Sequence, residues 1–161
     1  EAYDAYADAI FRHCYFRVYQ QELAKDLTQQ AFMKVWQYLA AGHAVENLRA
    51  LLYKAANNLV IDEFRKKRET GSLEALQETG FEPGIETGPD LERQLDQQRI
   101  RPYLQRLETD QRDLLVMRYI DDLSPKEIAE LLGETPNVIS VRLHRALARL
   151  RRLIPPYVFS F

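Results

Sequence analysis

SPKEIAELLGETPNVI, residues 124–139, contains the start of one helix, its end and the start of the next. Ser124 and Glu127 have the spacing of a capping box, and a proline fills the first helical position, where a backbone N–H is not needed. Gly133 is the residue type that most readily takes the left-handed conformation at a helix C-terminus. Thr135, followed by a second proline, predicts another N-cap. The stretch therefore predicts two helices joined by a tight turn.

The spacing of Ala129, Gly133 and Ile139 within this stretch is typical of a helix-turn-helix. A small residue lets the two helices approach, a glycine makes the turn, and a branched apolar residue packs the second helix on the first. The same spacing also occurs in plain helical hairpins. It favours DNA binding without excluding a hairpin in a bundle.

The second helix, predicted from Pro136 to Ile154, has two stripes of opposite character. Its apolar stripe comprises Ile139, Leu143, Ala146, Leu150 and Leu153. Its arginine stripe comprises Arg142, Arg145, Arg149 and Arg152. Residues 138–154 contain no acid, whereas a solvated helix normally mixes charges to gain pairs one turn apart. A phosphate backbone is the natural partner for such a face.

The first seventy residues show the helical period three times, which predicts a small bundle. The apolar positions are Phe11, Cys14, Tyr15 and Val18; then Ala24, Leu27, Ala31 and Val35; then Leu48, Leu52, Ala55 and Leu59. Asn47 is a good N-cap for the third helix. The opposite side of that helix bears a polar stripe, which comprises Lys54, Asn58, Asp62 and Arg65 and runs into Lys66-Lys67-Arg68. Taken alone, this stripe is as compatible with a solvated helix face as with a surface that binds DNA.

Length and composition agree with two small helical domains. The chain has 161 residues, 46% of them apolar, and a formal net charge of −2. That charge is unevenly distributed, because residues 49–68 carry six basic groups and residues 69–98 carry eight acids and one base. Four of the six glycines lie in the acidic part, which lacks a sustained apolar period. We predict domains at 1–68 and 91–161, joined by a flexible acidic linker at 69–90.

Other classes of protein have little support in the sequence. Cys14 is the only cysteine, and the three histidines are scattered, so we expect no disulfide, no metal site and no cofactor. We find no phosphate-binding glycine-rich loop and no nucleophile with a recognisable base, and therefore expect no enzyme. No apolar run approaches the ~20 residues that span a bilayer. We expect a cytoplasmic protein without a signal peptide or membrane insertion.

Three segments together resemble the extracytoplasmic-function sigma factors, the small two-domain class of bacterial sigma-70-type initiation factors. AKDLTQQAFMKVW, residues 24–36, resembles the helix of that family that docks on polymerase. LLYKAANNLVIDEFRKKR, residues 51–68, resembles its helix for the −10 promoter element. EIAELLG, residues 127–133, and VRLHRA, residues 141–146, resemble its −35 helix-turn-helix. The resemblance covers roughly residues 5–68 and 92–154, in the order of the family.

The resemblance implies an all-α fold with an N-terminal bundle of three to four helices and a C-terminal four-helix domain. It implies binding to core RNA polymerase, to promoter DNA and to an anti-sigma factor, by a chain that is monomeric when free. The expected polymerase contacts are Asp26, Gln29, Gln30, Phe32, Lys34 and Trp36. The expected −10 contacts are Lys54, Asn57, Asn58, Asp62, Arg65, Lys66, Lys67 and Arg68. The expected −35 contacts are Pro136, Asn137, Val138, Ser140, Val141, Arg142, His144, Arg145 and Arg149.

The chain departs from the family pattern at a few positions. Gln30 replaces a usual acid, Asn57 replaces a frequent arginine, and Ser140-Val141 replaces a frequent Lys-Ser pair. Two other interpretations stay open. An ordinary helix-turn-helix regulator would bind a specific duplex without polymerase, usually a palindrome. A helical protein that only binds other proteins would show no salt-dependent affinity for DNA.

Overall fold

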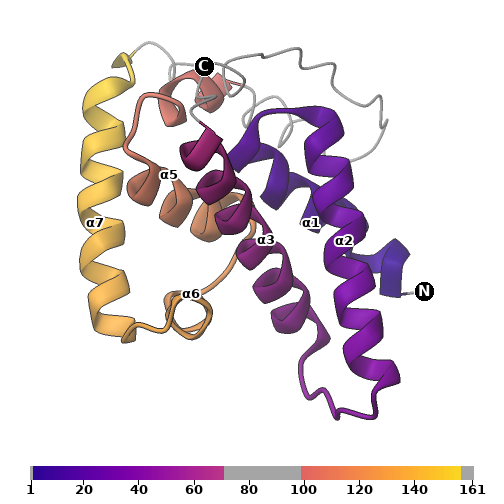
Figure 1. Ribbon diagram of the computed structural model, residues 1–161. Helices are drawn as coiled ribbons and strands as arrows, with labels where there is room; N and C mark the ends of the chain where they lie inside the picture. Colours follow the sequence, from indigo (N-terminus) through magenta and orange to yellow (C-terminus); the bar gives the residue numbers. More distant parts are fainter. Residues whose placement is uncertain (1, 71–98, 157–161) are drawn as a thin grey trace. The chain divides into compact units, whose positions relative to one another are not determined.

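The computed structural model describes residues 2–70 and 99–156, and the chain divides into two compact units, residues 1–81 and 82–161 (Figure 1). The regular structure of the described residues is entirely helical, which confirms the expected all-α class. The acidic linker expected at 69–90 lies outside the described residues from position 71 onward. Its first two residues belong to the third helix, which extends to Thr70.

The N-terminal unit is a bundle of three helices, α1 (Ala2–Val18), α2 (Gln21–Ala40) and α3 (Leu48–Thr70), and each packs on the other two (Figure 1). The apolar stripes predicted for the first two helices lie in the core, apart from the half-buried Phe11. Asn47 caps α3 as expected, because its Oδ1 accepts a hydrogen bond from the Ala50 N–H at 3.1 Å.

The buried face of α3 is rotated from the predicted stripe. Its buried residues are Leu52, Tyr53, Ala56, Asn57, Leu59 and Val60, whereas Leu48 and Ala55 are only half-buried. Tyr53 accounts for part of the rotation, since its ring meets the edge of the buried His13 ring with centroids 5.4 Å apart. An aromatic ring buries more area than an alanine, so the helix turns the tyrosine inward.

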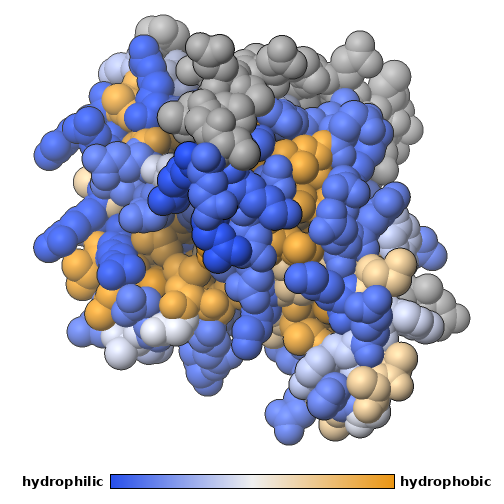
Figure 2. All heavy atoms as spheres, in the orientation of Figure 1, coloured by the Kyte–Doolittle hydropathy of each residue, from blue (hydrophilic) through white to orange (hydrophobic). Residues whose placement is uncertain are grey.

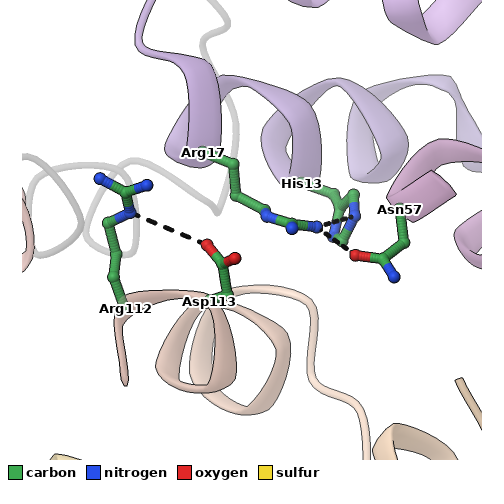
Figure 3. Close-up of polar contacts among 5 residues, drawn as sticks. All are labelled: His13, Arg17, Asn57, Arg112 and Asp113. Carbon is green, nitrogen blue, oxygen red and sulfur yellow. Dashed lines mark hydrogen bonds and ion pairs between the residues drawn. The ribbon is translucent and has the colours of Figure 1, made fainter. Parts of the chain in front are cut away.

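A buried polar bridge joins α1 to α3 (Figure 3). Arg17 Nη1 donates to Asn57 Oδ1 and also lies 3.2 Å from His13 Nε2. A guanidinium can only donate, so Nε2 is the accepting nitrogen of His13. All three side chains are at most 2% exposed. Because buried polar groups need partners, this bridge fixes the rotation of α3 against α1.

In the described part of the C-terminal unit, residues 99–156, the regular structure is also helical. Residues 99–104 are helical, and α5 (Thr109–Leu115) continues into the π-helical turn η2 (Val116–Ile120). Then come α6 (Pro125–Leu132) and α7 (Pro136–Leu153), and α7 packs on both α5 and α6. These helices form the expected four-helix domain, with the π-helical turn as a feature that the apolar period does not predict.

The turn between α6 and α7 has the predicted chemistry. Ser124 Oγ accepts from the Glu127 N–H at 3.1 Å, and Glu127 Oε1 accepts from the Ser124 N–H at 3.1 Å. Gly133 is left-handed, with φ 69° and ψ 36°, and Thr135 Oγ1 accepts from the Val138 N–H at 3.3 Å. Ala129 and Ile139 are buried. The helix-turn-helix is therefore confirmed as a fold.

Replacing Ser124 by alanine should weaken the start of α6, because it removes the hydroxyl that accepts from the Glu127 amide. Loss of an N-cap costs about 1 kcal/mol, which corresponds to roughly five-fold faster exchange of the α6 amides when exchange follows unfolding of this unit. Hydrogen exchange of the full chain, followed by mass spectrometry, measures this change. Ser140→Ala, at an exposed position within α7, is the control and should leave α6 unchanged. Equal protection in Ser124→Ala and parent would contradict the capping role.

Candidate functional site

The outer side of α2 is an exposed face that combines polar and apolar residues. Its buried side contains Ala24, Leu27, Thr28, Ala31 and Val35. The exposed side, called the docking face here, comprises Asp26, Gln29, Gln30, Met33 and Trp36. Trp36 is 71% exposed and Met33 is 59% exposed, although both are large and apolar. An exposed tryptophan beside a methionine is typical of a surface that is covered by a partner.

The structure separates the six expected polymerase contacts into three groups. Asp26, Gln29, Gln30 and Trp36 share the docking face, and Gln30 Nε2 donates to Asp26 Oδ2 at 2.7 Å. Phe32 is half-buried, and its ring centroid lies 4.9 Å from that of the exposed Tyr3. Lys34 is exposed on the flank of the helix.

Met33 is a member of the docking face that the sequence analysis missed. Positions 26, 29, 33 and 36 follow the three-four-three spacing that places residues on one side of a helix. That spacing could have identified Met33 from the sequence. Methionine is usually buried, however, and the pattern alone does not distinguish an apolar residue that binds a partner from one that lies in the core.

The polar stripe of α3 lies at the surface, where Lys54, Asn58 and Arg65 are exposed and Asp62 is half-buried. Asp62 Oδ1 accepts from Arg65 Nη2 at 3.0 Å. The acid therefore orients the arginine. Ile61 is 46% exposed beside the stripe and was not among the expected contacts. Beyond the stripe, Lys66 and Arg68 are exposed and Lys67 is half-buried.

Asn57 does not share this surface. It lies on the buried side of α3, where it accepts from Arg17, and a residue that is 2% exposed cannot touch DNA in this conformation. The physical reason is its position one residue before Asn58, which rotates it by about 100° around the helix. Two adjacent asparagines thus have different environments, one in the core and one at the surface.

The arginine stripe covers the outer side of α7. The side chains of Arg142, Arg145, Arg149 and Arg152 are exposed, opposite the buried Ile139, Leu143, Ala146 and Leu150. Figure 2 shows hydrophilic side chains projecting along this side of the helix, at the left of the view. The other expected −35 contacts near the start of α7, Pro136, Asn137, Ser140, Val141 and His144, are exposed too, and Val138 is half-buried.

One acid does reach the arginine stripe, although none lies within residues 138–154. Glu134, in the turn before α7, places Oε1 3.6 Å from Arg142 Nη2. Both side chains are partly exposed, at 37% and 51%. This acid comes from outside the helix, because the turn brings Glu134 back beside Arg142.

Residues 2–70 and 99–156 contain no group of three or more histidine, cysteine or acidic side chains arranged to hold a metal ion. In the same residues, no helix has both the length and the apolar character that a bilayer crossing requires. Three helix faces in the described residues carry the expected contacts: the docking face on α2, the polar stripe on α3 and the arginine stripe on α7.

Comparisons with known proteins show which family the chain resembles. Residues 2–70 match the family model of sigma-70 region 2, and residues 97–150 match that of sigma-70 region 4. RNA polymerase sigma factor YlaC of Bacillus subtilis is 28% identical over 154 residues, which are 94% of this chain and 89% of YlaC. The ECF RNA polymerase sigma factor ShbA of Streptomyces griseus subsp. griseus is 32% identical over 142 residues, which are 85% of this chain and 72% of ShbA.

Solved structures agree on the fold. The sigma factor RpoE of Bartonella quintana, crystallised with the anti-sigma factor NepR, has a TM-score of 0.74 at 23% identity, over 94% of this chain and 93% of that one. CnrH in complex with the cytosolic domain of CnrY has a TM-score of 0.68 at 21% identity, over 94% and 84%. The chain belongs to the sigma-70 family of transcription initiation factors, in its extracytoplasmic-function group, and acts with RNA polymerase in promoter recognition.

Proposed function

We propose that each of the three helix faces has one task in initiation. The docking face binds core polymerase, the polar stripe binds the −10 element as it opens, and the arginine stripe with the start of α7 binds the −35 duplex. One observation carries the proposal: each face lies opposite a buried apolar stripe, so its side chains are free of the core. The first two faces lie in the part that matches region 2, and the third in the part that matches region 4.

The chemistry of the docking face suits a partner helix with basic and polar groups. Asp26 supplies a carboxylate and Gln29 an amide, so the face can both accept and donate hydrogen bonds. Met33 and Trp36, at 59% and 71% exposed, supply the apolar anchor that a polar rim can surround. The Gln30–Asp26 hydrogen bond holds the carboxylate in place before the partner arrives.

The polar stripe suits a strand that is leaving the duplex. Extruding a base costs a few kcal/mol, so the protein has to bind the exposed base and its phosphates. Asn58 presents an amide that can pair with a base edge, and the neighbouring Ile61 presents an apolar surface. Arg65, held by Asp62, and the exposed Lys66 and Arg68 can bind phosphates along the strand.

The start of α7 suits the major groove of a duplex. Its first exposed residues, Asn137, Ser140 and Val141, are short and allow the backbone to approach base edges. Arg142 follows within reach of the groove. Arg145 and Arg149, further along the helix, are placed for phosphates, which fix orientation without reading sequence.

The remaining expectations are part of the same proposal. The chain itself catalyses no reaction, because the polymerase performs the chemistry, and it works in the cytoplasm, where polymerase and promoter DNA meet. It needs no metal or cofactor. We also expect an anti-sigma partner, since RpoE of Bartonella quintana, which has a similar fold, was crystallised with the anti-sigma factor NepR. Such a partner would compete with polymerase for the exposed Met33 and Trp36.

Asp26→Ala combined with Gln29→Ala should weaken binding to bacterial core polymerase by about ten-fold or more, because the two side chains supply a carboxylate and an amide that bond to the partner beside the apolar anchor. Thermal stability should change little, since exposed polar positions cost under ~0.5 kcal/mol. A titration of labelled chain with core polymerase measures the first effect, and circular dichroism measures the second. Gln105→Ala combined with Glu130→Ala, two exposed positions of the other unit, is the matched control. Equal polymerase affinity for the docking variant and parent would reject the assignment.

Asn58→Ala should slow strand opening more than it weakens initial binding, because a neutral amide contributes hydrogen bonds to a base and no attraction to phosphate. Loss of one to two such bonds, at ~1 kcal/mol each, slows opening by roughly five- to thirty-fold. Permanganate reactivity of thymines in the promoter follows opening, and a filter assay follows binding. Gln105→Ala controls for the loss of an exposed amide. If opening were unaffected, Asn58 would be a solvated surface residue.

Arg142→Ala should reduce discrimination between promoters with and without the preferred −35 element by about 1–3 kcal/mol, the value of a bidentate guanine contact. Lys66→Ala combined with Lys67→Ala should weaken binding near −10 whatever the −35 sequence. Competition binding of the two holoenzymes to matched promoter fragments separates the two effects. The helix-turn-helix would lose its role in recognition if Arg142→Ala left both affinity and −35 discrimination intact.

A further inference from the structure

We infer that Glu134, in the turn of the helix-turn-helix, is a positioning residue that makes Arg142 select a base rather than a phosphate. The inference rests on the proposed binding of α7 to the −35 duplex. Its starting observation is the ion pair between Glu134 Oε1 and Arg142 Nη2, at 3.6 Å. It concerns the specificity of promoter recognition and assigns a role to a residue outside the expected contacts.

The backbone holds Glu134 firmly on both sides. The left-handed Gly133 precedes it, and its own N–H donates to the Ala129 carbonyl at 2.9 Å. Thr135 follows as the N-cap of α7, with its Oγ1 accepting from the Val138 N–H at 3.3 Å. The carboxylate is therefore attached to a rigid turn, whereas Arg142 has a longer side chain that would otherwise sample many rotamers.

Among the members of the arginine stripe, Arg142 is the one that Glu134 contacts. Arg145 and Arg149 lie three and seven residues further along α7, which places them about 4.5 and 10 Å further from the turn along the helix axis. Glu134 is thus close to the arginine nearest the helix start, where α7 can enter a groove. An exposed ion pair contributes under ~1 kcal/mol to stability. The main effect of this pair is therefore to orient the Arg142 guanidinium.

Charge explains how this geometry becomes specificity. A guanidinium has five N–H donors in a planar fork, so one of them can face Glu134 while two others form the parallel bonds that guanine O6 and N7 accept. A phosphate beside Arg142 would instead lie close to the carboxylate and be repelled. A guanine edge carries no net charge and meets no such repulsion. Glu134 therefore disfavours contact between Arg142 and a phosphate, which reads no sequence, and leaves the contact with guanine, which does.

Removing the charge of Glu134 should raise the affinity for unrelated DNA and lower the specificity for the −35 element. Glu134→Gln should raise affinity for unrelated DNA and steepen the salt dependence by about one counterion, because Arg142 becomes available to a phosphate. Discrimination at one base pair of the −35 element should fall by about five-fold or more. Glu134→Asp keeps the charge at a shorter reach and should retain part of the discrimination. A role confined to stability would move neither the base preference nor the salt slope.

The test uses the full chain assembled with bacterial core polymerase and a promoter library with a randomised −35 segment. Bound fragments are sequenced for the parent, for Glu134→Gln and for Glu130→Gln, which removes an exposed acid from α6. The inference requires a base preference in the parent that Glu134→Gln relaxes at one position and Glu130→Gln leaves intact. It also requires that Glu134→Gln has no further effect on specificity when Arg142 is alanine.

Three outcomes would overturn the inference, and they differ in what else they reject. A parent holoenzyme without any −35 preference would reject the proposed role of α7 and the inference with it. A clear parent preference that Glu134→Gln leaves unchanged, with an unchanged salt slope, would reject the inference alone. An additive effect of Glu134→Gln on specificity in the Arg142→Ala background would also reject it, because Glu134 would then act without Arg142.

Discussion

Burial of one apolar stripe on each helix is the constraint on which the rest of the structure depends. On α2, burial of Leu27 and Val35 leaves Asp26 and Trp36 at the surface. On α7, burial of Ile139 and Leu143 does the same for the arginine stripe. On an amphipathic helix of 3.6 residues per turn, burial of the apolar stripe leaves the opposite side at the surface. The exposed faces are thus set by the core, and a change in the rotation of a helix would change the residues at the surface.

The Arg17 bridge shows how the N-terminal unit controls that rotation. Apolar packing alone tolerates small rotations, because leucine and alanine have no directional contacts. Arg17 bonds to His13 on α1 and to Asn57 on α3, and both bonds are directional. A rotation of α3 would leave these buried groups without their partners. The bridge therefore keeps Asn57 inside and the adjacent Asn58 outside.

The sequence predicted the helices, their caps and the helix-turn-helix because these features are local. The capping box at Ser124, the left-handed Gly133 and the Asn47 cap each depend on residues within four positions. The features that the sequence did not predict depend on contacts between segments. The apolar period did not reveal the rotation of α3 around the His13–Tyr53 pair, and no local rule predicts that Asn57 would bond to a residue forty positions away. The acid beside Arg142 was missed for the same reason, because the turn folds Glu134 back on the helix.

Promoter-specific initiation tests the central claim most directly. The full chain is added to bacterial core polymerase with templates whose −10 and −35 segments are randomised, and the transcripts and their templates are sequenced. The account predicts transcripts that start at a fixed distance from two enriched elements and appear only when the chain is present. Specific binding to a duplex without polymerase, together with no transcript above that of core polymerase alone, would contradict it and would favour an ordinary helix-turn-helix regulator.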